Sequence, residues 1–175
     1  VKCILPSLVK DLHDKNWKSK IVNVEILGHF SFCAPKQLSQ FLPTVIKELL
    51  IVFKDPHPKV LETAVKVLKD ISSVITNPEI VDISEILINA FSNPYELSKQ
   101  ALTSLLNTKF QHAIDPPSLG LIIPIIDYNL RIYNDENKKM AAQLIGAICY
   151  LITNPEIIHP YLDIILPNLK NALFD

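Results

Sequence analysis

The sequence contains little glycine and cysteine, and it has no excess of charge of either sign. Its 175 residues include three glycines, three cysteines and one tryptophan. Lysine and arginine total 17 and aspartate and glutamate total 18, so the formal net charge of -1 predicts no overall attraction to nucleic acid. Because 49% of the residues are hydrophobic, a disordered chain is excluded and a folded body with a sizeable core is expected.

Long hydrophobic runs are also absent. Apolar stretches such as residues 121–126 are short and are interrupted by proline, lysine or aspartate, whereas a membrane-spanning helix needs about 20 apolar residues. We therefore expect no membrane partner. The chain starts at Val1-Lys2 with neither an initiator methionine nor the apolar stretch of a signal peptide, which favours a fragment of a much longer chain.

The cysteines are too few and too far apart to form a disulfide framework or a metal site. Cys3, Cys33 and Cys149 are odd in number, and reduced thiols, typical of the cytoplasm or the nucleus, explain them better. We predict a cytoplasmic protein whose cysteines lie largely on buried helix faces. Paired runs that alternate between apolar and polar residues are missing too, which argues against strands.

One hexapeptide occurs twice. The sequence ITNPEI at residues 75–80 returns unchanged at residues 152–157, 77 positions later. That distance predicts two repeating units of roughly 38 residues each, within the period of HEAT and armadillo repeats. Aliphatic residues four positions apart place each member of a second repeating pattern in the first helix of a helical pair. This pattern occurs at residues 5–8, 42–45, 83–86, 123–126 and 166–169.

The stretches between these segments predict a second helix in each pair. The clearest follows the turn sequence DPHP, and its apolar residues recur every three or four positions over residues 60–75. We expect Asp55 to cap this helix and Pro58 to occupy its first turn. Gly28 and Gly146 fall within the first and fourth of these second helices, where close packing of neighbouring helices would explain a residue without a side chain.

Taken together, these patterns predict an all-α fold, an α-solenoid of HEAT repeats with about four helix pairs plus one extra helix. The extra helix is expected to run from about Glu156 to Phe174. We expect residues 1–175 to form a single solenoid segment, because a HEAT pair buries its apolar face only by stacking on its neighbours.

No set of residues indicates catalysis. The five histidines are scattered, and none stands at metal-ligand spacing from another histidine or from a cysteine. No glycine-rich phosphate loop is present, and no nucleophile has a base beside it. We therefore predict a non-enzymatic protein without catalytic residues, a cofactor or a metal.

Lysines gather where each first helix is followed by its second helix. If these turns stack along one edge of the solenoid, they form a discontinuous basic ridge that would meet phosphates or an acidic protein. The alternative is that the lysines only solvate the helix starts. Trp17 would stack on a base or pack two repeats together, and packing is the favoured role. The predicted ridge consists of Lys15, Trp17, Lys18, Lys20, Lys54, Lys59, Lys99, Lys138 and Lys139.

Several motifs resemble those of one known family. They are DKNWKSK at residues 14–20, DPHPKV at 55–60, TNPEI at 76–80, FQHAIDPPS at 110–118 and KKMAAQLIG at 138–146. With these motifs the chain resembles, over nearly its whole length, the HEAT region of the general-control-nonderepressible-one family of translational activators, in the part that is similar to elongation factor three. Translation elongation factor three itself is the close alternative.

The resemblance implies a ribosome-binding scaffold. Members of the family bind translating or collided ribosomes, through rRNA or ribosomal proteins, and promote activation of the kinase that phosphorylates initiation factor two alpha in amino-acid starvation or ribosome stalling. The resemblance also implies an ATP-binding-cassette partner protein, and contact with the kinase only through other parts of the chain. The alternatives are the HEAT arm of elongation factor three and a generic protein-interaction solenoid, such as a transport receptor or a phosphatase scaffold.

Overall fold

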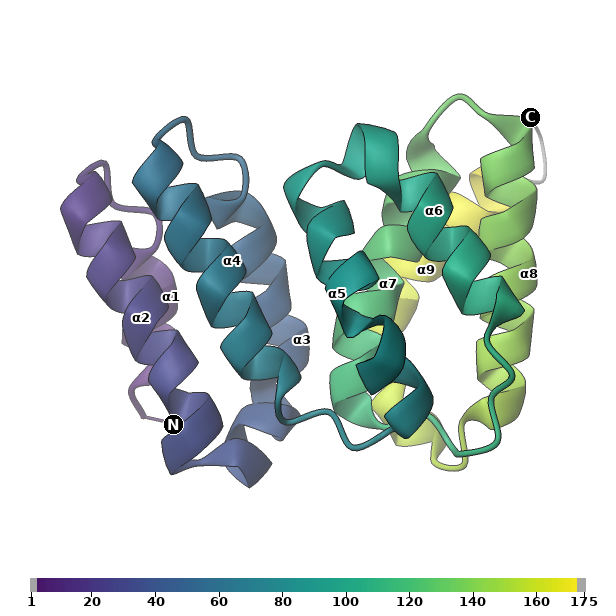
Figure 1. The fold of residues 1–175 in the computed structure, drawn as a ribbon, viewed down its shortest axis with the longest axis horizontal. Helices are drawn as coiled ribbons and strands as arrows, with labels where there is room; N and C mark the ends of the chain where they lie inside the picture. Colours follow the sequence, from purple (N-terminus) through teal and green to yellow (C-terminus); the bar gives the residue numbers. More distant parts are fainter. Residues whose placement is uncertain (1–2, 173–175) are drawn as a thin grey trace. The chain divides into compact units, whose positions relative to one another are not determined.

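The computed structural model describes residues 3–172. Over this range the chain forms nine α-helices, one short 3₁₀ turn and no strand (Figure 1), so the prediction of an all-α fold is confirmed. The elements are α1 (Leu5–Asp11), α2 (Trp17–Cys33), α3 (Pro35–Val52), α4 (Pro58–Ser72), α5 (Pro78–Ser92), α6 (Pro94–Asn107), α7 (Pro116–Arg131), α8 (Asp135–Leu151), η1 (Pro155–Ile157) and α9 (His159–Ala172).

The predicted division into helix pairs is also confirmed. The first helices of the pairs are α1, α3, α5 and α7, the second helices are α2, α4, α6 and α8, and α9 is the extra helix. The last helix differs from the expectation at its start, because the Asn154-Pro155 sequence forms the separate turn η1 and α9 begins only at His159. Phe174, the expected end of that helix, lies outside the described residues.

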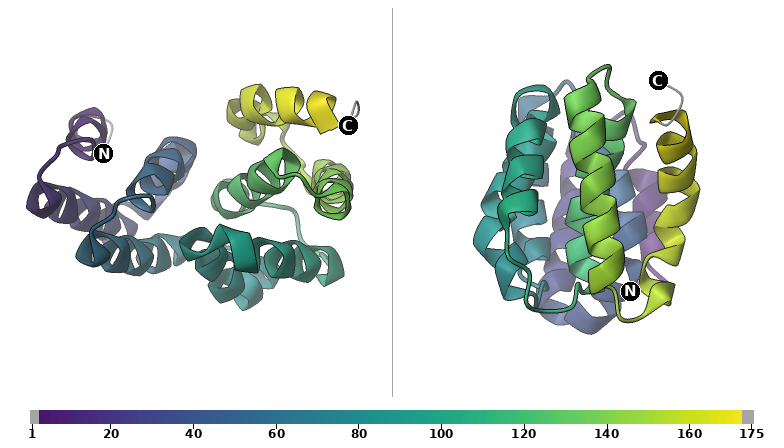
Figure 2. Two further views of the ribbon diagram at one scale, coloured as in Figure 1. Left: turned by 90° about the horizontal axis from the view of Figure 1, so that it is seen from above. Right: turned by 90° about the vertical axis from the view of Figure 1, so that its right-hand side faces the viewer.

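The chain divides into two compact units, which we call unit one (α1–α4) and unit two (α5–α9). In unit one the main contact is between the second helices α2 and α4. Helix α1 packs on α2, and α3 packs on both α2 and α4. In unit two α7 contacts both α5 and α9, and α6 contacts α8 (Figure 2). Each unit therefore shows the two-layer arrangement of a HEAT array, with first helices in one layer and second helices in the other. That all 175 residues form one segment stays a prediction.

Each unit has its own apolar core. Fully buried leucine and isoleucine side chains occur in every helix from α2 to α7, at the three- and four-residue spacing predicted from the sequence. Each such side chain stabilises the fold by roughly 1.5–3 kcal/mol relative to an exposed one. The largest are Leu27, Leu38, Leu42, Leu49, Leu68 and Ile71 in unit one and Ile80, Leu87, Ile88, Leu102, Leu105 and Leu119 in unit two.

Side-chain caps and prolines define where several helices begin. Asn16, Asn77, Asp115 and Asn134 each accept a hydrogen bond from a backbone N–H in the first turn of the following helix. The prediction that Asp55 caps α4 is wrong in detail. His57 occupies the cap position without a side-chain cap, and Asp55, two residues earlier, accepts the His57 N–H at 2.9 Å.

The two helical glycines have different environments. A Cβ atom on Gly28 would lie 3.0 Å from Cγ2 of Val67, so close packing of α2 against α4 explains this glycine, as predicted. The same prediction for Gly146 is wrong, since an added Cβ there meets no atom within 4 Å. Gly146 lies on the exposed side of α8, between the buried Leu144 and Ile148.

The cysteines are exposed, which contradicts the prediction that they lie largely on buried faces. Cys149 follows the buried Ile148 by one residue, and a step of one residue turns the side chain by about 100° around the helix axis. Its neighbour Tyr150 is almost fully exposed, which marks this side of α8 as the outer one. Cys33 is the last residue of α2, and Cys3 precedes α1.

Candidate functional site

The turns between first and second helices hold the predicted ridge, and in unit one two aromatic rings join them. The indole of Trp17, at the start of α2, stacks on the imidazole of His57, at the start of α4. The ring centroids lie 4.1 Å apart and the ring planes differ by 11°. This contact links two successive repeats, so the favoured role of Trp17, packing, agrees with the geometry.

Lysines surround this stack. The ammonium groups of Lys18 and Lys59 lie 5.7 Å and 5.8 Å from the centroid of the Trp17 ring, within the range of a cation–π contact. Lys15 and Lys54 lie in the two turns that lead to Trp17 and His57. All four side chains are exposed, and none forms an ion pair within the described part of the chain. We call Lys15, Lys18, Lys54 and Lys59 the unit-one lysines.

Lys20 has a different role from these four. Its ammonium donates a hydrogen bond to Oδ2 of Asp55 at 2.5 Å, and both side chains are largely buried. The hydrogen bond from Lys20 holds the pKa of the Asp55 carboxyl below its usual value of 3.8, helped by the His57 N–H. The pair therefore joins α2 to the α3–α4 turn. It also neutralises the charge of Asp55, which stands two positions before His57 of the aromatic stack.

The predicted ridge residues of unit two are mostly engaged by their own neighbours. Lys99 forms an exposed ion pair with Glu136 at 2.6 Å. Lys138 is only 8% exposed, and its ammonium lies 5.3 Å from the centroid of the Tyr133 ring. Lys139 is exposed and has no ion pair among the described residues. Unit two therefore presents fewer free ammonium groups at these turns than unit one does.

The opposite turns of unit two hold acidic residues that stabilise the fold. Asp115 accepts hydrogen bonds from the backbone N–H and the hydroxyl of Thr76, both at 2.7 Å, and from Ser118 at the start of α7. Burial would raise the pKa of Asp115, but these hydrogen bonds outweigh it and hold the pKa below 3.8. Glu79 accepts a hydrogen bond from His112 at 2.6 Å, which lowers the pKa of its carboxyl.

These contacts explain two of the sequence motifs. Thr76, Asn77 and Glu79 belong to the motif TNPEI, and each bonds to the segment FQHAIDPPS. The amide of Asn77 donates to the carbonyl oxygen of Ala113 at 3.2 Å. The two motifs thus hold each other in place, with both carboxylate oxygens of Asp115 and one of Glu79 engaged in hydrogen bonds.

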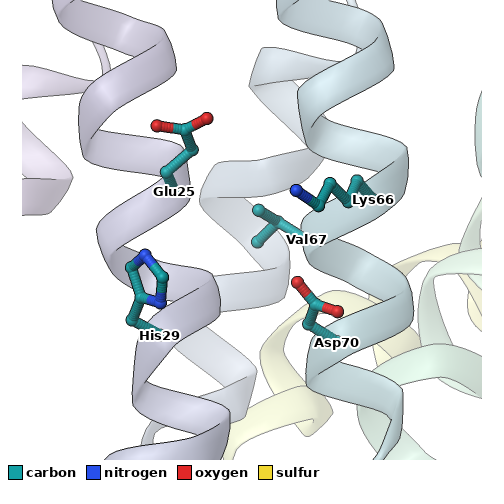
Figure 3. Close-up of a pocket in the computed structure, with 5 residues that line it drawn as sticks. All are labelled: Glu25, His29, Lys66, Val67 and Asp70. Atoms are coloured by element: carbon teal, nitrogen blue, oxygen red, sulfur yellow. The ribbon is translucent and has the colours of Figure 1, made fainter.

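A shallow cavity of about 160 Å³ lies between α2 and α4, away from the turns (Figure 3). Its lining consists of Glu25, His29, Lys66, Val67 and Asp70. No serine, threonine or cysteine nucleophile lines this cavity, so its residues form no hydrolytic triad. Among the described residues, no group of three histidine, cysteine or acidic side chains could hold a metal ion, and none of the helices combines the length and the hydrophobicity that a membrane span requires.

The sequence prediction omitted His57 from the ridge, although it holds Trp17. The sequence did contain a pattern that points to His57. Trp17 and His57 stand 40 positions apart, which is one repeat, so they occupy equivalent turns of successive helix pairs. An aromatic ring at the same place in two adjacent repeats is a candidate for a stacked contact.

Two family descriptions match most of the chain. Residues 1–68 match the "EF3 N-terminal HEAT repeat" and residues 97–174 match the "Elongation factor 3/GNC1 HEAT repeat". The chain is 44% identical over its whole length to "Protein ILITYHIA" of Arabidopsis thaliana and 42% identical to "Stalled ribosome sensor GCN1" of Homo sapiens. It spans only 7% and 6% of those relatives.

Similarity to elongation factor three is lower. "Elongation factor 3B" of Saccharomyces cerevisiae is 28% identical over 98% of this chain, which spans 16% of that relative. "eIF-2-alpha kinase activator GCN1" of the same yeast is 34% identical over the whole chain. The motifs, the paired helices and these matches agree, and the chain belongs to the elongation factor 3/GNC1 family of HEAT repeats, on the side of the GCN1 translational activators.

Proposed function

We propose that this chain is a non-catalytic, ribosome-binding scaffold segment of a translational activator. Relatives that share 34–44% of its residues include a "Stalled ribosome sensor" and an "eIF-2-alpha kinase activator". The segment supplies part of the ribosome contact, and the whole protein promotes activation of the kinase that phosphorylates initiation factor two alpha. Contact with the kinase occurs through other parts of that protein. An ATP-binding-cassette partner and a cytoplasmic location complete the proposal.

The exposed unit-one lysines carry the proposal of ribosome binding. Four ammonium groups without acidic partners make a local positive surface on a chain whose net charge is only -1. Such a surface attracts polyanions, and its attraction weakens as salt increases. Lys139 belongs to the same class, whereas Lys20, Lys99 and Lys138 contribute less because they already have partners.

Charge reversal in the full-length protein tests the proposal. Changing Lys15, Lys18, Lys54 and Lys59 to Glu should weaken co-sedimentation with ribosomes. Raising the salt concentration should likewise weaken the co-sedimentation of the unchanged protein. Reversal of Lys66 and Lys69, which are exposed on α4 outside the turns, serves as the control. Salt-insensitive binding that survives the fourfold reversal would refute the assignment and favour a generic protein-interaction solenoid.

A further inference from the structure

The Trp17–His57 stack brings charges from two repeats together. Lys18 follows Trp17 in α2, and Lys59 follows His57 by two residues in α4. Because each ammonium lies within 6 Å of the centre of one ring, the two ammonium groups stand within about 12 Å of each other. If the two turns were not in contact, the distance between their ammonium groups could vary freely. Here a nearly parallel ring pair joins the two turns that bear them.

The acidic residues near the stack do not cancel these charges. Asp55 is bound to Lys20, and Asp14 accepts the backbone N–H of Asn16 at 3.3 Å. Neither carboxylate forms an ion pair with Lys18 or Lys59 in the described part of the chain. Both ammonium groups thus remain available to an anion from outside.

The separation of the two ammonium groups suits the regularly spaced phosphates of a nucleic-acid backbone. Lysine presents a compact point charge that binds a phosphate oxygen without requiring a fixed orientation of the anion. The single arginine of the sequence, Arg131, lies in unit two and pairs with Asp127 at 2.9 Å. Each strand of a nucleic-acid duplex carries one phosphate per about 3.4 Å of helix axis, so two cations at this separation can meet phosphates a few nucleotides apart.

We infer that Lys18 and Lys59 form a two-point clamp for the phosphate backbone of RNA, and that Trp17 and His57 are its positioning residues. The inference rests on the proposed ribosome binding, and it names RNA rather than an acidic protein as the partner of this surface. The rings act through the lysines by fixing the distance between the two turns. The clamp reads charge and spacing, and it has no means of reading base sequence.

The first test measures binding of the full-length protein to purified rRNA at several salt concentrations. Changing both Lys18 and Lys59 to Glu should weaken binding and should lower the slope of log affinity against log salt by about one for each lysine. The matched control, Lys66→Glu with Lys69→Glu, makes the same change of charge on α4 and should leave the slope nearly unchanged. An equal effect of both pairs would overturn the clamp.

The second test addresses the positioning residues. Trp17→Ala removes the stack without changing any charge, and it should lower the salt slope toward that of the double lysine variant. Trp17→Phe keeps a ring at the same place and should restore most of the slope. Circular dichroism confirms that each variant is folded. A folded Trp17→Ala protein with the original slope would show that Trp17 only packs, and would overturn its positioning role.

The third test separates this inference from the proposed function. Polyglutamate and a mixed-sequence RNA are compared as competitors for rRNA binding, and the lysine variant is assayed with whole ribosomes in parallel. RNA should compete far better than polyglutamate. If the lysine variant loses ribosomes but keeps rRNA, and polyglutamate competes, the partner is an acidic protein and the RNA inference fails while ribosome binding stands. If ribosome binding is unchanged as well, the proposed function fails at this surface.

Discussion

At the scale of single residues, equal residue types have unequal roles because their surroundings differ. Gly28 and Gly146 occupy the interiors of second helices, yet only Gly28 faces a close neighbour. Lys18 is exposed beside an aromatic stack, whereas Lys20, two positions later, is paired with Asp55. Helical rotation explains this second contrast, since two residues turn the side chain by about 200° and carry it to another face.

The two glycines offer a matched experiment. Gly146→Ala should increase the free energy of unfolding by about 1 kcal/mol, because alanine favours the helix and open space receives its methyl group. Gly28→Ala gains the same propensity but places Cβ 3.0 Å from Val67, so the cost of overpacking, about 1–3 kcal/mol, cancels or exceeds the gain. Urea unfolding of both variants measures the difference. Equal stabilisation of the two would contradict the close contact in unit one.

The Lys20–Asp55 pair predicts a pH dependence. Because the folded pKa of Asp55 lies below 3.8, its contribution to stability is complete above that pH and is lost as the pH falls through the folded value. Asp55→Asn should cost about 2 kcal/mol at pH 7, the scale of a hydrogen bond to a charged group. The difference in stability between the variant and the original protein should shrink below about pH 4.

Asp127 serves as the control, because its pKa is shifted in the opposite direction to that of Asp55. Burial raises the pKa of its carboxyl above 3.8, despite the nearby Arg131. Its ionised form therefore disfavours folding, and this cost grows as the pH rises from 3.8 through the folded pKa. Relative to Asp127→Asn, the original protein should gain stability on acidification. A parallel trend for both aspartates in thermal unfolding at pH 3 to 7 would contradict the assigned shifts.

At the scale of elements, the duplicated hexapeptide shows how one local sequence forms different structures. At residues 77–80 it opens the long helix α5, and at residues 154–157 it forms the isolated turn η1. Both asparagines accept a backbone hydrogen bond, from Ile80 in the first copy and from Glu156 in the second. Only the first copy is embedded, because Asn77 also donates to Ala113 in the segment before α7.

This difference predicts unequal costs for the same substitution. Asn77 is 3% exposed, so Asn77→Ala removes a buried cap together with the hydrogen bond to the carbonyl oxygen of Ala113, at a cost of about 2 kcal/mol. Asn154 is exposed, and Asn154→Ala should cost about 0.5 kcal/mol. Denaturant unfolding followed by circular dichroism compares the two. The prediction fails if Asn154→Ala is the more damaging change.

At the scale of the whole molecule, the chain has two compact units with separate cores. In a repeat protein, stability is approximately a sum of the contributions of repeats and of their nearest-neighbour contacts. A defect in one core should therefore be felt most strongly in the helices that touch it. For Leu102 in α6 these helices are α5, α7 and α8.

Leu102→Ala tests this locality. The loss of a fully buried leucine side chain costs about 2–5 kcal/mol, and we expect hydrogen exchange to accelerate in α5 to α8 more than in α2 and α4. Hydrogen exchange followed by mass spectrometry resolves the helices separately. The reciprocal variant, Leu68→Ala in α4, should accelerate exchange mainly in α2 and α4. A uniform acceleration along the whole chain in both variants would indicate a single cooperative body.

The sequence by itself determined the all-helical class, the pairing of helices, the repeat of roughly 40 residues and the family. These features depend on periodic apolar residues, prolines and turn motifs, which act over a few positions and can be read along one dimension. The ridge lysines could be named in the same way, because they stand at predictable turns. Whether each of these lysines is free or paired with an acidic residue could not be predicted from the sequence.

Only the tertiary structure decided which lysines are free, since Lys20 and Lys99 meet acidic partners 35 and 37 positions away. The same reason applies to the stack of Trp17 on His57, to the contact that explains Gly28, and to the exposed cysteines that periodicity assigned to buried faces. Each depends on how one helix is rotated against the next. That rotation is set by the fit of side chains from both helices, and it brings together residues that lie a repeat apart.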